Sequence, residues 1–119
     1  MDISKVIAEM KKEPGFSENV GMILIHNGVV RGWSRQGHKP VTSIEVAVDE
    51  PKIAALREEY SKKPGIYRIL IEHHAGRLNL GDDLLFILVA GDIRENVKPV
   101  LSELLDRIKT DAVTKSELT

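Results

Sequence analysis

Four side chains that can carry a positive charge lie within a short segment of this 119-residue chain. They are Arg31, Arg35, His38 and Lys39, and Trp33 lies among them. Guanidinium groups bind phosphate oxygens through paired hydrogen bonds, so this composition suits an anionic ligand. Two glycines, one proline and the lack of periodicity predict that the segment is a loop. This loop is either a flap that folds over such a ligand or a solvated loop with one semi-exposed aromatic ring.

A second set of basic side chains belongs to a helix expected near the C-terminus. Apolar residues recur there with a helical period, which predicts one face packed on a sheet. This apolar face consists of Val97, Val100, Leu101, Leu104, Leu105 and Ile108. On a helical projection, Arg94, Lys98 and Lys109 fall on one flank of that face. These basic residues either border a ligand pocket or snorkel, with their stems covering apolar surface and their charged heads in water.

Pro99 leaves two possible starts for this helix. A helix that begins at Asp92 contains the proline, which removes a backbone hydrogen bond and bends the axis. A helix that begins at Asn96 has Pro99 in its first turn and leaves Arg94 outside.

Two adjacent histidines, His73 and His74, fall at the end of an apolar run. Neighbouring side chains on a strand point to opposite faces, so the pair is not expected to hold one metal ion. The chain has no HExxH motif, no P-loop, no dinucleotide-binding glycine pattern and no cysteine. Neither a metal nor a cofactor is therefore expected.

The charge balance and the hydropathy limit the classes of partner. Lys and Arg number 17 and Asp and Glu number 18, for a net charge of −1. Nucleic-acid binders usually carry a large positive excess, so nucleic acid is not an expected partner. The longest apolar run is Leu84–Ala90, whereas a membrane-spanning helix needs about 20 residues, so no membrane association is expected. A cytoplasmic location is the default for a chain without cysteine.

The elements that must position these residues alternate between helix and strand. The patterns predict a first helix ended by Pro14-Gly15, and a final segment, Thr110–Thr119, that reads as a frayed terminus. Strands are expected at Val20–Ile25 before an Asn27-Gly28 turn, at Ser43–Val48, and in a hairpin of Ile66–His73 with Leu84–Ala90. A middle helix capped by Asp49 is expected to run to about Lys62, before the last helix. This order predicts one α+β domain over residues 1–119, with an antiparallel or mixed sheet and packed helices.

In order and spacing, several segments resemble the large, catalytic subunit of molybdopterin synthase. The matching segments are Gly21 with the strand after it, Gly28-Val29-Val30-Arg31, the stretch from Ile71 to Asp82, the apolar strand that ends at Ala90, Arg94, Ile108-Lys109 and Lys115-Ser116-Glu117. Together they cover the chain from about Val20 to Glu117. The resemblance implies an α/β hammerhead-type fold.

The resemblance also implies a function in molybdenum cofactor biosynthesis. Enzymes of this family transfer sulfur to cyclic pyranopterin monophosphate and produce the dithiolene of molybdopterin. The sulfur arrives as a thiocarboxylate on the C-terminal glycine of a small ubiquitin-like sulfur-carrier subunit. Two large and two small subunits are expected to form a heterotetramer around a homodimer of large subunits.

The resemblance implies a role for each basic residue. Lys109 matches the catalytic lysine, and Lys115 matches a second lysine near the end of the family pattern. Arg31 and Arg94 match substrate-binding arginines, and the loop residues Arg35 and His38 are further substrate-binding candidates. Along one continuous helix, Arg94 and Lys109 would lie about 22 Å apart, so Arg94 is expected to serve the pocket of the neighbouring subunit.

This chain departs from the family pattern near the expected pocket. His26 stands where the family has another aromatic residue, Ile93 replaces a histidine, and the Pro-x-Trp before Lys115 is missing. The retained Arg and Lys residues favour an active sulfurtransferase. The loss of the histidine at Ile93 favours a non-catalytic relative that binds the small subunit or a pterin phosphate. Without its proline and tryptophan, the tail is expected to be ordered only when the small subunit binds.

Overall fold

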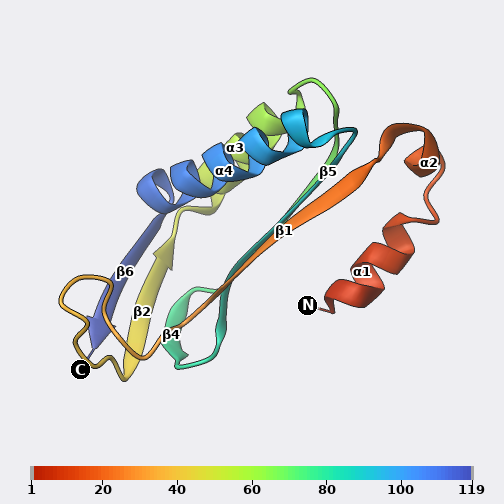
Figure 1. Ribbon diagram of the computed structural model, residues 1–119. Helices are drawn as coiled ribbons and strands as arrows, with labels where there is room; N and C mark the ends of the chain where they lie inside the picture. Colours follow the sequence, from red (N-terminus) through yellow and green to blue (C-terminus); the bar gives the residue numbers. More distant parts are fainter. Residues whose placement is uncertain (1, 119) are drawn as a thin grey trace.

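The computed structural model describes residues 2–118, which form an elongated molecule of 49 × 26 × 25 Å. A three-stranded antiparallel sheet runs along its length (Figure 1). Its order is β1 (Met22–Val29), β5 (Asp83–Gly91), β3 (Ile66–His73). The antiparallel pairing of β3 with β5 confirms the predicted hairpin.

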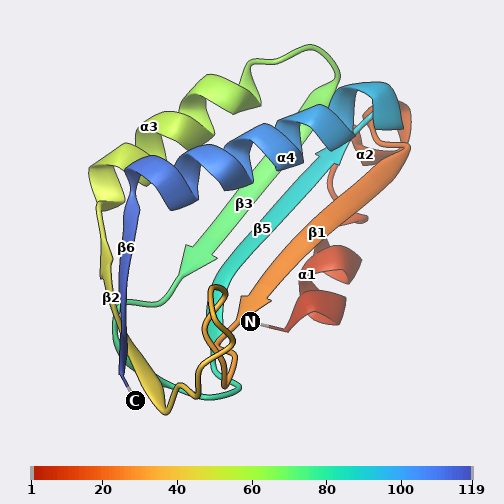
Figure 2. The ribbon, with the colours of Figure 1, turned by 60° about the vertical axis from the view of Figure 1, so that its left-hand side comes forward.

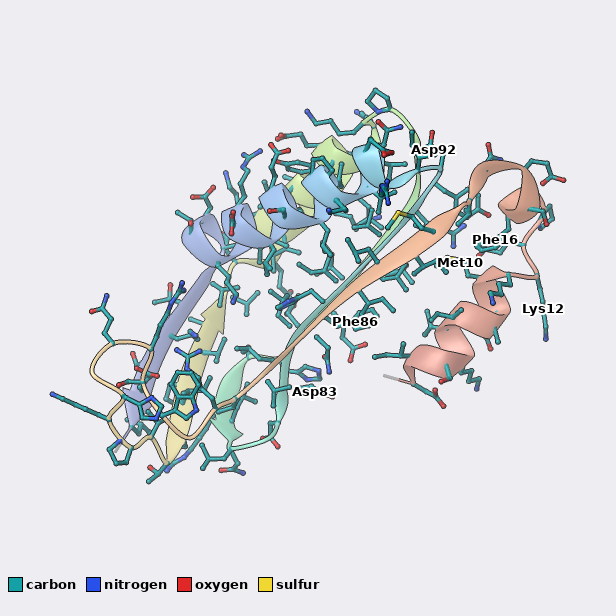
Figure 3. All side chains as sticks on the ribbon, in the orientation of Figure 1. Met10, Lys12, Phe16, Asp83, Phe86 and Asp92 are labelled. Carbon is teal, nitrogen blue, oxygen red and sulfur yellow. The ribbon has the colours of Figure 1, made fainter. Side chains whose placement is uncertain are left out.

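Both faces of this sheet are covered. The helices α3 (Glu50–Ser61) and α4 (Arg94–Asp111) lie on one face, and α1 (Ile3–Met10) lies on the other (Figure 2). Alternate residues of β5 therefore enter two separate apolar layers. Ile87 faces α4, whereas Phe86 packs with Met10 on the α1 side (Figure 3). This double burial explains why the central strand is a continuous apolar run in the sequence.

Local sequence accounts for the ends of the helices. The Asp2 and Asp49 carboxylates accept hydrogen bonds from the backbone N–H groups of Lys5 and Lys52, which caps α1 and α3. The short α2 (Phe16–Asn19) follows α1. The predicted first helix and the Asp49 cap are confirmed.

The last helix is continuous from Arg94, so Pro99 lies inside it and Arg94 is its first residue. Its predicted apolar face is confirmed, because Val97, Leu104 and Ile108 are completely buried against the sheet. This packing holds the helix together across the backbone hydrogen bond that the proline cannot make.

A second, smaller antiparallel sheet closes one end of the molecule. Its order is β4 (Gly76–Asn79), β2 (Ser43–Val48), β6 (Val113–Leu118). The predicted β2 is confirmed, but β4 lies inside the segment that was expected to be a plain hairpin loop. The tail prediction is wrong for residues 113–118, which pair with β2 along its whole length. Thr119, the last residue of the predicted tail, lies outside the described residues.

The expected turn at Asn27-Gly28 is also wrong. Both residues belong to β1 and pair with Phe86 and Leu85 of β5. The turn propensity of this dipeptide is local, whereas the ladder joins β1 to the central strand over its whole length. The register shifts only between Gly28 and Val29, and the chain reverses later, in the loop that follows β1.

Candidate active site

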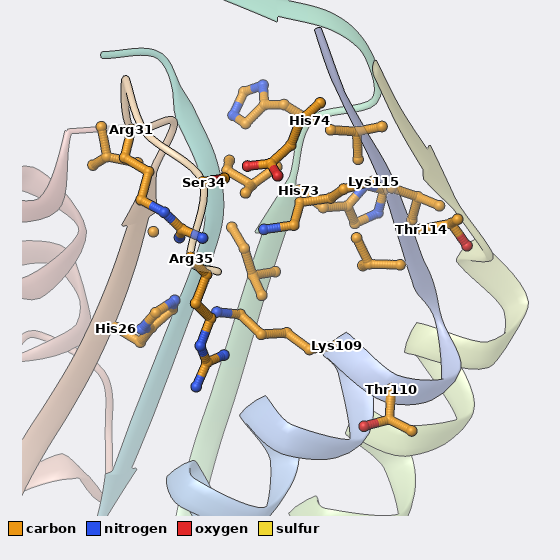
Figure 4. A pocket seen from close by; sticks show the side chains of 18 of the residues that line it. His26, Arg31, Ser34, Arg35, His73, His74, Lys109, Thr110, Thr114 and Lys115 are labelled. Atoms are coloured by element: carbon orange, nitrogen blue, oxygen red, sulfur yellow. The ribbon is translucent and has the colours of Figure 1, made fainter. Parts of the chain in front are cut away.

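A cavity of about 710 Å³ lies where the two sheets meet the C-terminal end of α4. Its walls come from the ends of β1 and β3, the loop after β1, and β2 and β6. Four of the predicted site residues line it: Arg31, Arg35, Lys109 and Lys115. Their side chains converge from the loop, from α4 and from β6 (Figure 4).

The loop after β1 is closed by its own contacts. Trp33 and Pro40 form a β-bridge, and the Ser34 N–H donates to the Lys39 carbonyl at 2.8 Å. Arg31 Nε donates to the Trp33 carbonyl at 2.9 Å, and its guanidinium carbon lies 4.9 Å from the indole centroid. This double contact holds the Arg31 guanidinium beside Trp33 in the pocket lining. Its remaining N–H groups have no hydrogen-bond partner among residues 2–118 and can donate to a ligand.

His38 does not line the pocket. Its ring stacks on the indole of Trp33, with the two centroids 4.7 Å apart, and its φ of 49° lies in the left-handed region. In the structure, the contact of His38 is with Trp33 of the same loop. Its contact with substrate stays a prediction.

The two lysines enter the pocket from different elements. Lys109 lies in the last turn of α4, directly after the fully buried Ile108, which fixes the backbone from which its side chain extends. Lys115 lies on β6 opposite Val46 of β2. Val113, Lys115 and Glu117 alternate along β6, and all three line the pocket.

Crowding by positive charge changes the proton affinity of Lys115. Desolvation by the pocket walls lowers the pKa of its amine most, and the positive charges of Arg31, Lys109 and Arg35 lower it further. The carboxylate of Glu117 acts in the opposite direction. Lys115 is an exposed residue, so the desolvation acts on the amine at the end of its side chain, which faces the pocket walls. A larger fraction of that amine is uncharged near neutral pH than for a free lysine.

The pocket is also lined by two partly buried histidines that were not among the predicted site residues. His26 and His73 lie on the same sheet face as α4, and each has one buried ring nitrogen without a hydrogen-bond partner among residues 2–118. Burial, followed by the positive charge of Lys109, lowers the pKa of His26. A signal for His26 exists in the sequence, because it follows Met22 and Leu24 at period two and is the polar end of an apolar row.

The neighbouring His74 also lines the pocket, although it was expected to face away from His73. Strand β3 ends at His73, so the alternation of a strand does not extend to the next residue. Across the described part of the chain, no group of three or more His, Cys, Asp or Glu side chains could hold a metal ion.

Arg94 lies at the other end of α4, far from this pocket. Its side chain is 78% exposed, and its Nε donates to the adjacent Glu95 carboxylate at 3.2 Å. Lys98 is exposed and also absent from the pocket lining. Within one chain, the predicted flank of basic residues therefore contributes only Lys109. The neighbouring Ile93, which precedes the helix, is 53% exposed.

Among residues 2–118, no helix is both long enough and apolar enough to span a membrane.

Relatives of this chain are found both by sequence and by structure. A curated relative from Haloferax volcanii, described as a probable molybdopterin synthase, is 27% identical over 120 residues. The match covers 97% of this chain and 46% of the relative, so the chain spans about half the length of that protein.

Solved structures share the fold. Molybdopterin synthase from Staphylococcus aureus superimposes with a TM-score of 0.77 at 21% identity, over 99% of this chain and 85% of that one. A complex of subunits 1 and 2 of the molybdopterin-converting factor from Helicobacter pylori contains a chain with a TM-score of 0.72 at 17% identity, over 99% and 79%. The sequence profile of the family described as MoaE protein matches residues 1–111. The chain therefore belongs to the MoaE protein family.

Proposed function

We propose that this protein is the large subunit of a molybdopterin synthase and acts in molybdenum cofactor biosynthesis. The reaction is the transfer of sulfur from a thiocarboxylate to cyclic pyranopterin monophosphate. The observation that supports this proposal is the convergence of four basic side chains on one cavity, namely Arg31, Arg35, Lys109 and Lys115. Both the phosphate of the substrate and the incoming thiocarboxylate are anions, and this arrangement attracts them.

The two kinds of cation have different tasks in this proposal. Arg31 and Arg35 bind the phosphate, because a guanidinium stays charged and presents paired donors. Lys109 and Lys115 carry the proton transfers or the nucleophilic step, because a lysine amine reacts when it is uncharged. The lowered pKa of Lys115 supports this division of tasks.

The proposed partners follow from the reaction. A small ubiquitin-like sulfur-carrier subunit supplies the thiocarboxylate at its C-terminus, and the two-subunit complex from Helicobacter pylori gives a precedent for such an assembly. Two large subunits form a homodimer, and each binds one small subunit. The cytoplasmic location expected from the sequence stays a prediction.

The direct test is to mix the purified protein with the thiocarboxylated small subunit from the same organism and with cyclic pyranopterin monophosphate. Formation of the dithiolene product is expected, and Lys109→Ala is the inactive control. Binding of both partners without product would instead identify a non-catalytic relative, the alternative that the residue at Ile93 favours. Failure to bind either the small subunit or the pterin phosphate would contradict both functions.

A further inference from the structure

His26 occupies a particular place in the wall of the pocket. It is on β1, on the face of the sheet that α4 covers, in the same row as Met22 and Leu24. These two apolar residues pack into the core under α4, whereas His26 lines the cavity. The imidazole thus lies at the point where the apolar row ends and the pocket begins, and the Lys109 side chain extends toward it (Figure 4).

The Nε2 atom of His26 is buried, and no hydrogen-bond partner for it exists in the described part of the chain. Gly28, two residues along the strand, leaves space beside this nitrogen, since a Cβ at that position would stand 3.1 Å from Nε2. Leaving a buried polar atom unpaired is unfavourable, so such an atom in a pocket wall is a candidate for completion by a ligand.

His26 differs in charge from the arginines and lysines of the same cavity. Burial and the Lys109 charge lower the pKa of its imidazole, so the ring is mainly neutral at pH 7. A neutral imidazole has one nitrogen that donates and one that accepts a hydrogen bond, whereas guanidinium and ammonium groups only donate. His26 can therefore recognise a polar group that the surrounding cations do not select.

We propose that His26 is a substrate-binding residue whose imidazole hydrogen-bonds an uncharged polar group of the bound organic phosphate, next to the cationic subsite that takes the phosphate. The ligand class is a phosphate ester of a polar heterocycle, so this inference rests on the proposed function and deepens it. By the family resemblance, relatives have another aromatic residue at the position of His26. A ring without nitrogen would fill similar space but would not make this hydrogen bond.

Three substitutions separate the contributions of the ring and of its two nitrogens. His26→Phe keeps an aromatic ring and removes both nitrogens. His26→Gln keeps a polar group near the position of Nε2, whereas His26→Asn keeps one near Nδ1 only. Calorimetry would measure the binding of cyclic pyranopterin monophosphate, and phosphorus NMR would measure the binding of inorganic phosphate. Thermal melting would verify that each variant is folded.

Loss of one hydrogen bond should weaken binding of the pterin phosphate roughly 10-fold in His26→Phe and His26→Asn. His26→Gln should restore most of this affinity, and all variants should bind inorganic phosphate like the wild-type protein. Equal affinity of His26→Phe and wild type for the pterin phosphate would overturn the inference and leave the proposed function intact. Absence of pterin phosphate binding to the wild-type protein would overturn both.

Discussion

Among the single residues of the pocket, Lys115 responds to the positive charges that surround it. Arg31, Arg35 and Lys109 all lower the pKa of Lys115, and Glu117 partly offsets them. Repulsion of this kind disfavours the charged form of a lysine and increases the fraction of reactive amine. The same positive field attracts anionic ligands, so a bound phosphate is expected to reverse part of the shift.

Lys115 gives the first prediction, which concerns the titration of its amine. Arg31→Gln removes a positive charge and should raise the pKa of Lys115, whereas Glu117→Gln removes a negative charge and should lower it further. The activity that depends on uncharged Lys115 should accordingly begin at higher pH in the first variant and at lower pH in the second. NMR titration of the lysine side-chain carbons would detect both changes. Shifts in the same direction for the two variants would contradict the proposed field.

Lys109 gives the second prediction. Lys109→Ala should lower the rate of product formation at least 100-fold, because general acid–base or nucleophilic groups contribute about 10²–10⁴-fold. The melting temperature of this variant should change little, because Lys109 is exposed, whereas the apolar contact at this turn is made by its buried neighbour Ile108. Lys98→Ala is the matched control, because that lysine is exposed on the same helix outside the pocket. A marked loss of stability in Lys109→Ala would instead support the snorkelling role.

The sequence identified the arginines and lysines that line the pocket. It did not identify His26 and His73 as site residues, and the reason is physical. Arg31, Lys109 and Lys115 are recognisable because the order and spacing of the motifs around them can be read without knowing how the chain packs. The importance of His26 depends on its burial and on its nearness to Lys109, which is 83 positions away in the sequence. Neither property is local. The period-two row of β1 indicates the face on which His26 lies, but it indicates neither the burial of the ring nor its nearness to Lys109.

Among the secondary-structure elements, α4 carries Lys109 in its last turn and is docked closely on the sheet at its other end. A Cβ at Gly91, the last residue of β5, would stand 2.6 Å from the Gly65 carbonyl oxygen and 2.6 Å from Val97 of α4. The absence of a side chain therefore allows β5, the loop before β3 and α4 to meet.

Gly91→Ala should consequently destabilise the protein by about 1–3 kcal/mol, as overpacking typically does. The backbone carbonyl of Gly65 cannot move aside without disturbing β3, so the helix must shift. Chemical denaturation would measure the loss. Gly76→Ala serves as a comparison in which a Cβ meets no atom within 4 Å, so that any loss there comes from backbone strain at its positive φ and not from overpacking. Equal stability of Gly91→Ala and wild type would contradict this packing.

Strand β6 shows where the sequence was misleading at this scale. Its residues are mainly polar, and its partner β2 lies about 70 positions earlier, so neither composition nor local pattern favoured a strand. An edge strand needs little apolar surface when its backbone hydrogen bonds to a neighbour. The well-patterned β2 and α3, by contrast, were predictable because each has an alternating or capped sequence of its own.

Hydrogen exchange tests this strand directly. Amides of residues 113–118 that bond to β2 should exchange slowly in the isolated protein, without the small subunit. Protection similar to that of β2 itself is the expected result. Exchange at the rate of a free peptide, with protection only after the partner binds, would restore the earlier expectation of a tail that orders on binding.

At the scale of the whole molecule, the pocket is made at one end and Arg94 is presented at the other. Helix α4 runs without a break from Arg94 to Asp111, so Arg94 and Lys109 are about 22 Å apart along one axis. One small substrate cannot contact both within a single chain. If Arg94 binds substrate, it must do so in the pocket of a second copy, and a homodimer with shared sites follows. Sedimentation should therefore find a dimer at micromolar concentration.

Mixing two inactive variants would test the shared site. In a dimer of Arg94→Ala with Lys109→Ala, one pocket combines an intact Lys109 with the intact Arg94 of the partner, and the other pocket lacks both. Random exchange of subunits should then restore about a quarter of wild-type activity, because half of the dimers are mixed and each has one complete site. Each variant alone should stay inactive, since every pocket in its dimers lacks one residue. No recovery after verified subunit exchange would show that Arg94 does not act across the dimer.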